Sequence, residues 1–348
     1  LHVILRNLYI MSKPIIFSII SILVTFGSAD INNDIYENSW AVVIGINKYH
    51  NAPTLSYAVQ DAQSVQSMLI DSFDYPPENI SLITDEQATK NNILRALSSM
   101  TSKAQSNDRV LIFFAGHGAT MDLPNGGEAG YLLPIEGDNN DLYLSSIGMD
   151  ELQKISSMSK SKHMLFLIDV CYGGIASVTS RSLGPIRGSG NQYIEKIIKN
   201  KARQIITAGG RGEKVIEKSE WGHSAFTKNL LSGLKDWQAD SDDDGYITTD
   251  ELGIYLKRHV TIDSENQQTP VKSQFGSDEG EFIFSKKLVN DDLEEDINEQ
   301  DTQIINYINR THDEDIFYNL GNYNSDFSEV SIIFYNSSKL IVGFQFSV

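Results

Sequence analysis

Apolar residues in the middle of the chain form short runs that are separated by stretches with a helical pattern. The runs occur at 40–46, 80–83, 110–114, 164–168, 204–207 and 281–284. Residues 55–70 and 89–104, which lie between the early runs, place apolar side chains at helical spacing. Nearly continuous apolar runs are typical of strands buried on both faces of a sheet. The sequence therefore predicts an α/β fold, with a mainly parallel central sheet and helices on both of its faces.

One long stretch interrupts this alternation and divides the predicted domain. Residues 176–203 contain many Gly, Ser, Lys and Arg, show little periodicity before Tyr193, and predict a long mobile loop. The domain as a whole is expected to span 38–286. A larger part at 38–175 precedes the loop, and a smaller part at 204–286 follows it.

Residues 287–348 differ in composition from the domain that precedes them. Residues 291–301 are mostly Asp, Glu, Asn and Gln, which predicts an acidic linker. Beyond the linker, 330–335 and 340–346 are suited to pair as a β-hairpin. The sequence indicates no role for this C-terminal tail.

The N-terminal residues have the pattern of a secretory signal. Met11 reads as the start, Lys13 supplies a positive charge, and an apolar run follows over 14–26. Small residues at 27–29 then offer a site for signal peptidase. We therefore expect 1–29 to be a cleaved signal peptide and the mature protein to be secreted, without a membrane anchor.

Composition narrows the classes of partner. The formal net charge is -18, so phosphate backbones are repelled and nucleic acid is excluded as a partner, whereas basic peptides and metal ions are attracted. The chain contains one cysteine, so no internal disulfide holds the fold. A lone thiol in a secreted protein indicates either a reactive group or an intermolecular partner.

Two polar motifs follow apolar runs and suggest catalytic chemistry. The run ending at Phe114 leads into His117 between two glycines, and the run ending at Ile168 leads into Cys171. Ligands bind at the carboxyl ends of strands in open α/β sheets. If the two strands are neighbours, His117 and Cys171 face one cleft.

A cysteine peptidase needs this pair of residue types. The thiolate is the nucleophile, and an imidazole accepts the thiol proton and later protonates the leaving amine. The N–H groups of Gly118 and Cys171 are the candidate oxyanion donors, because neighbouring glycines let a substrate carbonyl approach. Taken singly, Cys171 reads as a small buried hydrophobe and His117 as a turn residue. Their matched positions favour catalysis.

The motifs resemble those of caspase-like cysteine peptidases, most closely the metacaspase branch and its prokaryotic relatives. The matching segments are 40–49, 58–62, 114–118, 131–134, 169–174, 205–209 and 222–227. His117 precedes Cys171 by 54 positions (171 minus 117), close to the caspase spacing of about 50. The resemblance covers 38–286 and implies a caspase-like fold, with Cys171 as nucleophile and His117 as general base.

The residue two positions before the nucleophile bears on specificity. Caspases carry Gln there and accept aspartate, whereas this chain carries Asp169. A buried carboxylate attracts Arg or Lys and repels a substrate carboxylate. The resemblance to metacaspases also implies that Asp169 holds a basic P1 side chain. An Asp that merely caps a turn, and cleavage after Asp, are the alternatives.

The 176–203 loop contains several basic residues between the two family-like parts. If the enzyme cleaves after Arg or Lys, it is expected to cleave itself there, with Arg181 and Arg187 as the favoured sites. An ordinary solvated basic loop is the alternative interpretation.

Residues 240–251 match the complete EF-hand calcium loop pattern, D-x-[DN]-x-[DN]-G-x5-E. The expected Ca²⁺ ligands lie at alternate positions and at the last one: Asp240, Asp242, Asp244, the Tyr246 carbonyl, Thr248 through water, and Glu251. Apolar residues on both sides predict the flanking helices. No organic cofactor is expected. An acidic turn that holds its shape without metal is the alternative.

Three functional classes follow from these motifs. The leading one is a secreted cysteine endopeptidase that acts on peptides or proteins with basic P1 residues. The second is a non-catalytic calcium-binding scaffold with a caspase-like fold, which is disfavoured because both Cys171 and His117 are present. The third is transpeptidation through the same thioester chemistry.

Overall fold

The computed structural model describes residues 35–171, 190–210, 213–276 and 278–285, together with a hairpin near the C-terminus. The chain divides into two units, Leu1–Lys287 and Leu288–Val348. In the second unit, β14 (Glu329–Asn336) pairs antiparallel with β15 (Lys339–Ser347), which is the hairpin expected from the sequence. The active-site candidates all lie in the first unit.

A six-stranded sheet forms the centre of the first unit, in the order β12-β8-β7-β3-β1-β2. Its strands are β1 (Ser39–Gly45), β2 (Ile80–Thr84), β3 (Arg109–Ala115), β7 (His163–Cys171), β8 (Ala202–Gly209) and β12 (Val271–Gln274). All neighbours pair in parallel except β12, which runs antiparallel to β8 along the edge. The prediction of a mainly parallel sheet is confirmed.

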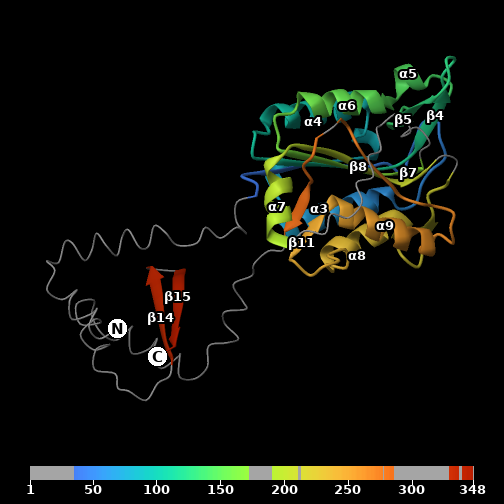
Figure 1. Cartoon of the computed structure of the whole chain (residues 1–348). Coiled ribbons are helices and arrows are strands. Elements are labelled where there is room, and N and C mark those ends of the chain that lie inside the picture. The colour runs from blue at the N-terminus through green and yellow to red at the C-terminus, as the bar shows by residue number, and fades with distance from the viewer. Residues whose placement is uncertain are drawn as a thin grey trace. The chain divides into compact units, whose positions relative to one another are not determined.

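Helices cover both faces of this sheet (Figure 1). One face carries α3 (Ala58–Phe73), α8 (Ala225–Lys235) and α9 (Thr249–Asp263), and the other carries α4 (Lys90–Lys103) and α6 (Met149–Met158). Successive strand residues therefore point into two separate cores. Val43 packs in the first core and Val42 in the second, and both are fully buried. Double coverage explains why the strand segments are apolar without alternation.

Smaller elements surround the carboxyl ends of the strands and the calcium-loop region. They are β4 (Gly118–Asp122), β5 (Glu128–Leu132), β6 (Ile147–Gly148), α5 (Leu142–Ser145), β9 (Glu217–Lys218), β10 (His223–Ser224), β11 (Tyr246–Thr248) and β13 (Ile283–Ser285). The short 3₁₀ turns η1 (Pro77–Asn79) and η2 (Asp85–Gln87) flank β2. The apolar run at 281–284 thus contributes β13, which pairs with β11 outside the central sheet.

The expected loop at 176–203 contains a helix, so the interpretation of the whole segment as a loop is wrong. Residues Gly190–Lys199 form α7. Ile194 and Ile197 lie one turn apart on its buried side, where they join a small cluster with Tyr246 and Ile283. Apolar residues at 193, 194, 197 and 198 have helical spacing, and tertiary packing of Ile194 and Ile197 supports the helix that this local pattern favours.

Within the described residues, no helix is long and apolar enough to cross a membrane. Residues 1–29 lie outside the described part of the chain, as do 286–328. The signal peptide and the acidic linker therefore stay predictions.

Candidate active site

The strands that carry the candidate dyad are neighbours. β3 pairs in parallel with β7, and Ala115 lies opposite Asp169. His117 and Cys171 each follow these paired residues by two positions, so both backbones reach the same edge of the sheet. Cys171 is the last residue of β7 and lies opposite Gly209 of β8. The expected adjacency of the two strands is confirmed, while the Cys171 side chain lies outside the described structure.

The His117 ring is held by a backbone carbonyl. Its Nε2 lies 2.8 Å from the Pro53 carbonyl oxygen. A carbonyl can only accept, so Nε2 carries the proton and the neutral ring keeps a lone pair on Nδ1. The His117 N–H donates to the Tyr49 hydroxyl at 2.8 Å, and the two rings lie 4.8 Å apart. His117 is thus oriented with a basic nitrogen available.

Glycines flank His117 because the site is crowded. A Cβ at Gly116 would collide with the Tyr49 hydroxyl that receives the His117 N–H. A Cβ at Gly118 would lie 2.9 Å from Cγ2 of Val170, the residue before Cys171. Gly118 therefore packs directly against the end of β7, where the predicted oxyanion donors would have to meet.

Asp169 is a buried carboxylate in which only one of the two oxygens has hydrogen-bond partners among the described residues. It is 2% exposed, and its Oδ2 accepts hydrogen bonds from Ser224 Oγ at 2.5 Å and Thr227 Oγ1 at 2.7 Å. Its Oδ1 is buried and has no hydrogen-bond partner among the described residues. Burial, followed by the nearby charge of Asp61, raises the pKa of Asp169 to about 7. Among the described residues its hydrogen-bond partners are these two hydroxyl groups rather than the backbone of a turn.

Asp61 is a second buried carboxylate that the sequence analysis did not assign. It lies in the first turn of α3, is 1% exposed, and its Oδ1 lies 2.5 Å from His223 Nδ1. Its Oδ2 accepts the Ser224 N–H at 3.3 Å. Burial raises its pKa, although the bond to His223 opposes that shift. The available signal was a charged residue on the otherwise apolar face of the 55–70 helix.

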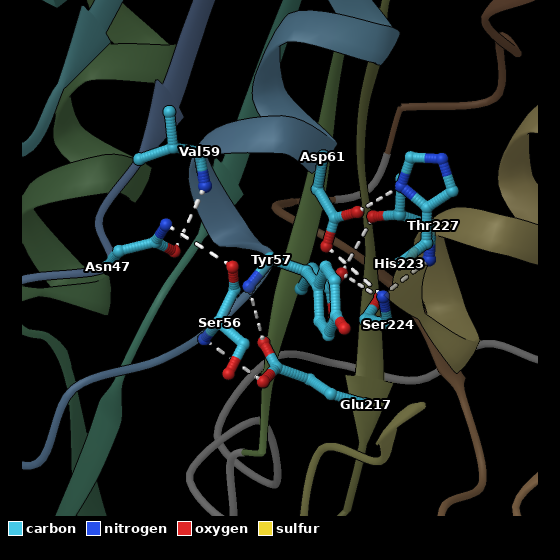
Figure 2. A network of polar contacts seen from close by, with 10 residues as sticks. Asn47, Ser56, Tyr57, Val59, Asp61, Glu217, His223, Ser224 and Thr227 are labelled. Atoms are coloured by element: carbon cyan, nitrogen blue, oxygen red, sulfur yellow. Dashed lines mark hydrogen bonds and ion pairs between the residues drawn. The ribbon is translucent and has the colours of Figure 1, made fainter. Parts of the chain in front are cut away.

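Glu217 of β9 is the third carboxylate near this edge (Figure 2). It accepts backbone N–H groups from Ser56 at 3.2 Å and Tyr57 at 3.3 Å, just before α3 begins. The charge of Glu217 raises the pKa of both Asp61 and Asp169, so the three groups share one electrostatic environment. We refer to Asp61, Asp169 and Glu217 as the carboxylate cluster.

No lysine or arginine forms an ion pair with the carboxylate cluster in the described part of the chain. His223 is the basic side chain in contact with it, through Asp61. Two of the three carboxylates of the cluster are buried, and none is paired with a lysine or arginine of the described residues. An anionic site of this kind favours a cationic group of a ligand. The cluster lies beside the strand ends that carry His117 and Cys171.

The acidic loop at 240–251 lies apart from these strand ends, between α8 and α9. One carboxylate oxygen from each of Asp240, Asp242 and Asp244 lies within 4.8 Å of the others. Asp240 Oδ1 is buried and has no hydrogen-bond partner among the described residues. Burial, and then the charges of Asp242 and Glu251, raise the pKa of Asp244 to about 6. Gly245 adopts a φ of 82°, which suits the sharp turn at the sixth position.

The remaining loop positions have structural partners of their own. Glu251 accepts the N–H and hydroxyl of Ser241 and caps α9 by bonding to Thr248. Ile247 is fully buried, as expected, and Tyr246 lies in β11 opposite Ser285. The β11 strand of this loop pairs with β13 of the same domain. In paired EF-hands, the strand of a second calcium loop takes that place. The residues present fit a calcium ion that Asp240, Asp242, Asp244 and Glu251 would hold.

The fold and the strand-end residues define a doubly covered α/β domain of the caspase type. A family model described as the caspase domain matches residues 38–275. The chain therefore belongs to the caspase-domain family.

Curated proteins named as metacaspases are similar to part of this chain. Metacaspase-1 of Eremothecium gossypii is 32% identical over 151 residues, covering 40% of this chain and 32% of the relative. Metacaspase-1A of Aspergillus oryzae is 30% identical over 148 residues, covering 39% of this chain and 34% of the relative. The chain thus spans about a third of these relatives' length. The solved structure titled pro-sf-caspase-1 matches with a TM-score of 0.43 and 14% identity, covering 75% of this chain and 98% of that chain.

Proposed function

We propose that the protein is a cysteine endopeptidase in which Cys171 is the nucleophile and His117 the general base. The observation that carries this proposal is the register of β3 and β7, since Ala115 and Asp169 lie opposite each other just before His117 and Cys171. The single cysteine of the chain follows one strand, and the oriented histidine follows its neighbour. The closing experiment of the Discussion tests it.

The chemistry follows from the His117 tautomer. His117 Nδ1 takes the thiol proton, and the thiolate attacks the scissile carbonyl to give a tetrahedral oxyanion. The N–H groups of Gly118 and Cys171 are the proposed donors to that oxyanion. The C–N bond then breaks as the imidazolium returns its proton to the amine, leaving a thioester. Water, deprotonated by the same imidazole, releases the acid and restores the thiol.

We further propose that the carboxylate cluster binds the P1 side chain and restricts it to Arg or Lys. Asp169 is two residues from the nucleophile and has one buried oxygen without a partner among the described residues. A guanidinium or ammonium group would supply the missing donors and the missing charge. Cleavage after Asp is disfavoured, because a substrate carboxylate would join three others at this site.

Self-cleavage of the enzyme is the first expected consequence of specificity for Arg or Lys at P1. Arg181 and Arg187, the expected sites, lie outside the described residues. Active enzyme is expected to appear as two fragments on a denaturing gel, and Cys171→Ala as one intact chain. Mass spectrometry of the fragments should locate the new ends. If fully active enzyme stays intact, or if replacing both arginines by Gln leaves the fragments unchanged, processing at these sites is wrong.

We also propose that residues 240–251 bind Ca²⁺ as a structural ion. The support is the full sequence pattern, the three converging carboxylates, and the buried Asp240 Oδ1 that accepts no hydrogen bond from the described residues. Ca²⁺ takes six to eight oxygen ligands and would relieve the repulsion between these charges.

Calcium is therefore expected to raise the unfolding temperature. At 100 times the dissociation constant, a ligand specific to the folded state adds about 2.7 kcal/mol, which corresponds to a shift of about 5–10 °C for a domain of this size. The measurement is thermal unfolding of Cys171→Ala in CaCl₂, with MgCl₂ as the ionic control. Asp242→Ala is the matched variant, because it removes a ligand oxygen and its exposed side chain caps no helix. An equal shift in Asp242→Ala, or none in the parent, would contradict the site.

A further inference from the structure

His223 connects the carboxylate cluster to a separate groove on the protein surface. It lies in the short strand β10, next to Ser224, whose hydroxyl donates to Asp169. Lys218 of β9 lies opposite His223, and Glu217 lies opposite Ser224. One two-stranded ribbon therefore holds Glu217 of the cluster, the donor to Asp169 and the partner of Asp61.

The two edges of the His223 ring have different surroundings. Nδ1 lies 2.5 Å from Asp61 Oδ1, and Asp61 is 1% exposed. The ring also lines a groove of about 470 Å³ between α3 and α8, together with Gln60, Ser64, Leu231 and Ser232. Figure 2 shows the second ring nitrogen on the side away from Asp61. The His223 side chain is 17% exposed. Its Nδ1 edge thus contacts a buried carboxylate, while another part of the ring lines the groove.

We propose that His223 is the positioning residue of the P1 site: it holds the Asp61 carboxylate ionised and oriented beside Asp169, and so sets the affinity for a cationic P1 side chain. This inference rests on the proposed function of the carboxylate cluster. Two buried carboxylates in one environment do not both stay ionised without compensation. The His223 N–H supplies that compensation at Asp61 Oδ1, and Asp169 Oδ1, which has no partner among the described residues, is left as an acceptor for the substrate.

Removal of His223 has a consequence that differs from general destabilisation. Without its donor, Asp61 and Asp169 would share a proton at neutral pH, and a protonated carboxyl group is a poorer acceptor for guanidinium. Binding of a cationic P1 group would weaken, whereas His117 and the strand ends would keep their contacts. The defect should therefore appear in KM rather than kcat, and only with a charged P1 residue.

The pH dependence is set by the charged groups around His223. Asp61 contacts its ring, with Asp169 and Glu217 in the same cluster, Lys218 lies opposite it on β9, and Asp71, Lys235 and Asp236 line the groove. The pKa of Asp169 is raised to about 7, so protonation of the cluster below that pH weakens binding of a basic P1 group. Loss of the His223 donor raises the carboxyl pKa values further. The acid limb of the pH profile, meaning the loss of binding on acidification, then moves to higher pH.

The test compares His223→Ala with His223→Asn, whose amide N–H takes the place of the Nδ1 donor. Peptides with Arg or its neutral isostere citrulline at P1 are the substrates. We expect His223→Ala to raise KM for the Arg peptide about tenfold, to change kcat less than about threefold, and to move the acid limb up by about one pH unit. His223→Asn should restore most of the KM. His259→Ala, on α9 against Tyr255, is the matched control.

Two results would overturn the role of His223. One is an equal loss with Arg and citrulline peptides, and the other is identical behaviour of His223→Ala and His223→Asn. Binding of agmatine to Cys171→Ala by calorimetry separates this proposal from catalysis, because it needs no turnover. Agmatine affinity should fall about tenfold when His223→Ala is added. If agmatine does not bind Cys171→Ala at all, the P1 site itself is wrong; if it binds equally with and without His223, only the positioning role fails.

Discussion

Replacing Asp169 by asparagine is expected to lower kcat/KM for a peptide with Arg at P1 by about 10²–10³-fold. The carboxylate is buried, and its Oδ1 lacks a partner among the described residues, so a substrate cation would gain a charge-assisted bond there. Truncating one partner of a buried charge pair costs about 2–5 kcal/mol, and the expected loss, about 2.7–4.1 kcal/mol, lies within that range. Steady-state kinetics with the Arg peptide measures the loss.

The same substitution is expected to leave the fold equally stable or more stable at neutral pH. The pKa of Asp169 is about 7 in the folded protein, against 3.8 for an unperturbed Asp. The folded state therefore binds the proton more tightly than the unfolded chain, and stability is lost as pH rises from about 4 to about 7. Asparagine carries no such charge, so thermal unfolding at pH 8 should show no decrease in midpoint.

Asp108 provides the matched control, because it is buried but fully engaged. It lies beside the amino end of β3 and accepts hydrogen bonds from Asn38, Trp40 and the Gln105 N–H at 2.8–3.0 Å. Asp108→Asn is expected to lower the free energy of unfolding by about 1–3 kcal/mol and to leave kcat/KM of the folded enzyme unchanged. If Asp169→Asn instead destabilises the protein and spares Arg cleavage, Asp169 is a structural residue.

Loss of either member of the dyad should have the largest effect on activity. Cys171→Ala removes the nucleophile, and His117→Ala removes the group that activates it, so each is expected to reduce kcat by about 10⁴-fold or more. The double variant should be no worse than the single ones, because both residues act in one step. Neither change should alter the unfolding midpoint by more than about 3 °C, since the half-buried His117 lies at a strand end.

Alkylation of the thiol is a second test of whether His117 activates Cys171. The thiolate reacts with iodoacetamide, so His117→Ala is expected to slow modification of Cys171 at pH 7. Equal rates of alkylation in wild type and His117→Ala would argue against His117 as the base. Residual peptide cleavage by Cys171→Ala at the wild-type rate would remove the cysteine mechanism altogether.

The sequence predicted the sheet well because the sheet is covered on both faces. Burial of Val42 and Val43 in opposite cores forces consecutive apolar residues, a pattern that is visible without knowledge of the partner strands. The register that places His117 and Cys171 at the same edge of the sheet follows from the adjacency of β3 and β7. That adjacency was an assumption in the sequence and is confirmed by the fold.

Features that depend on contacts between distant segments were harder to predict. Helix α7 has apolar residues at helical spacing within a basic segment, and the packing of Ile194 and Ile197 against Tyr246 and Ile283 shows which pattern prevails. Asp61 meets His223 across 162 positions, so only the misplaced charge on an apolar helix face could have marked it. The EF-hand pattern, by contrast, is local, and twelve consecutive residues were enough to indicate it.

The most direct test is cleavage of fluorogenic peptides that end in Arg, Lys or Asp, by wild type and by Cys171→Ala, each with Ca²⁺ present. The account predicts cleavage after Arg and Lys, no cleavage after Asp, and loss of all activity in Cys171→Ala. Cleavage after Asp would keep the cysteine peptidase but contradict the role of the carboxylate cluster. No cleavage of any peptide by processed, calcium-loaded wild type would contradict the central claim and favour a calcium-binding scaffold.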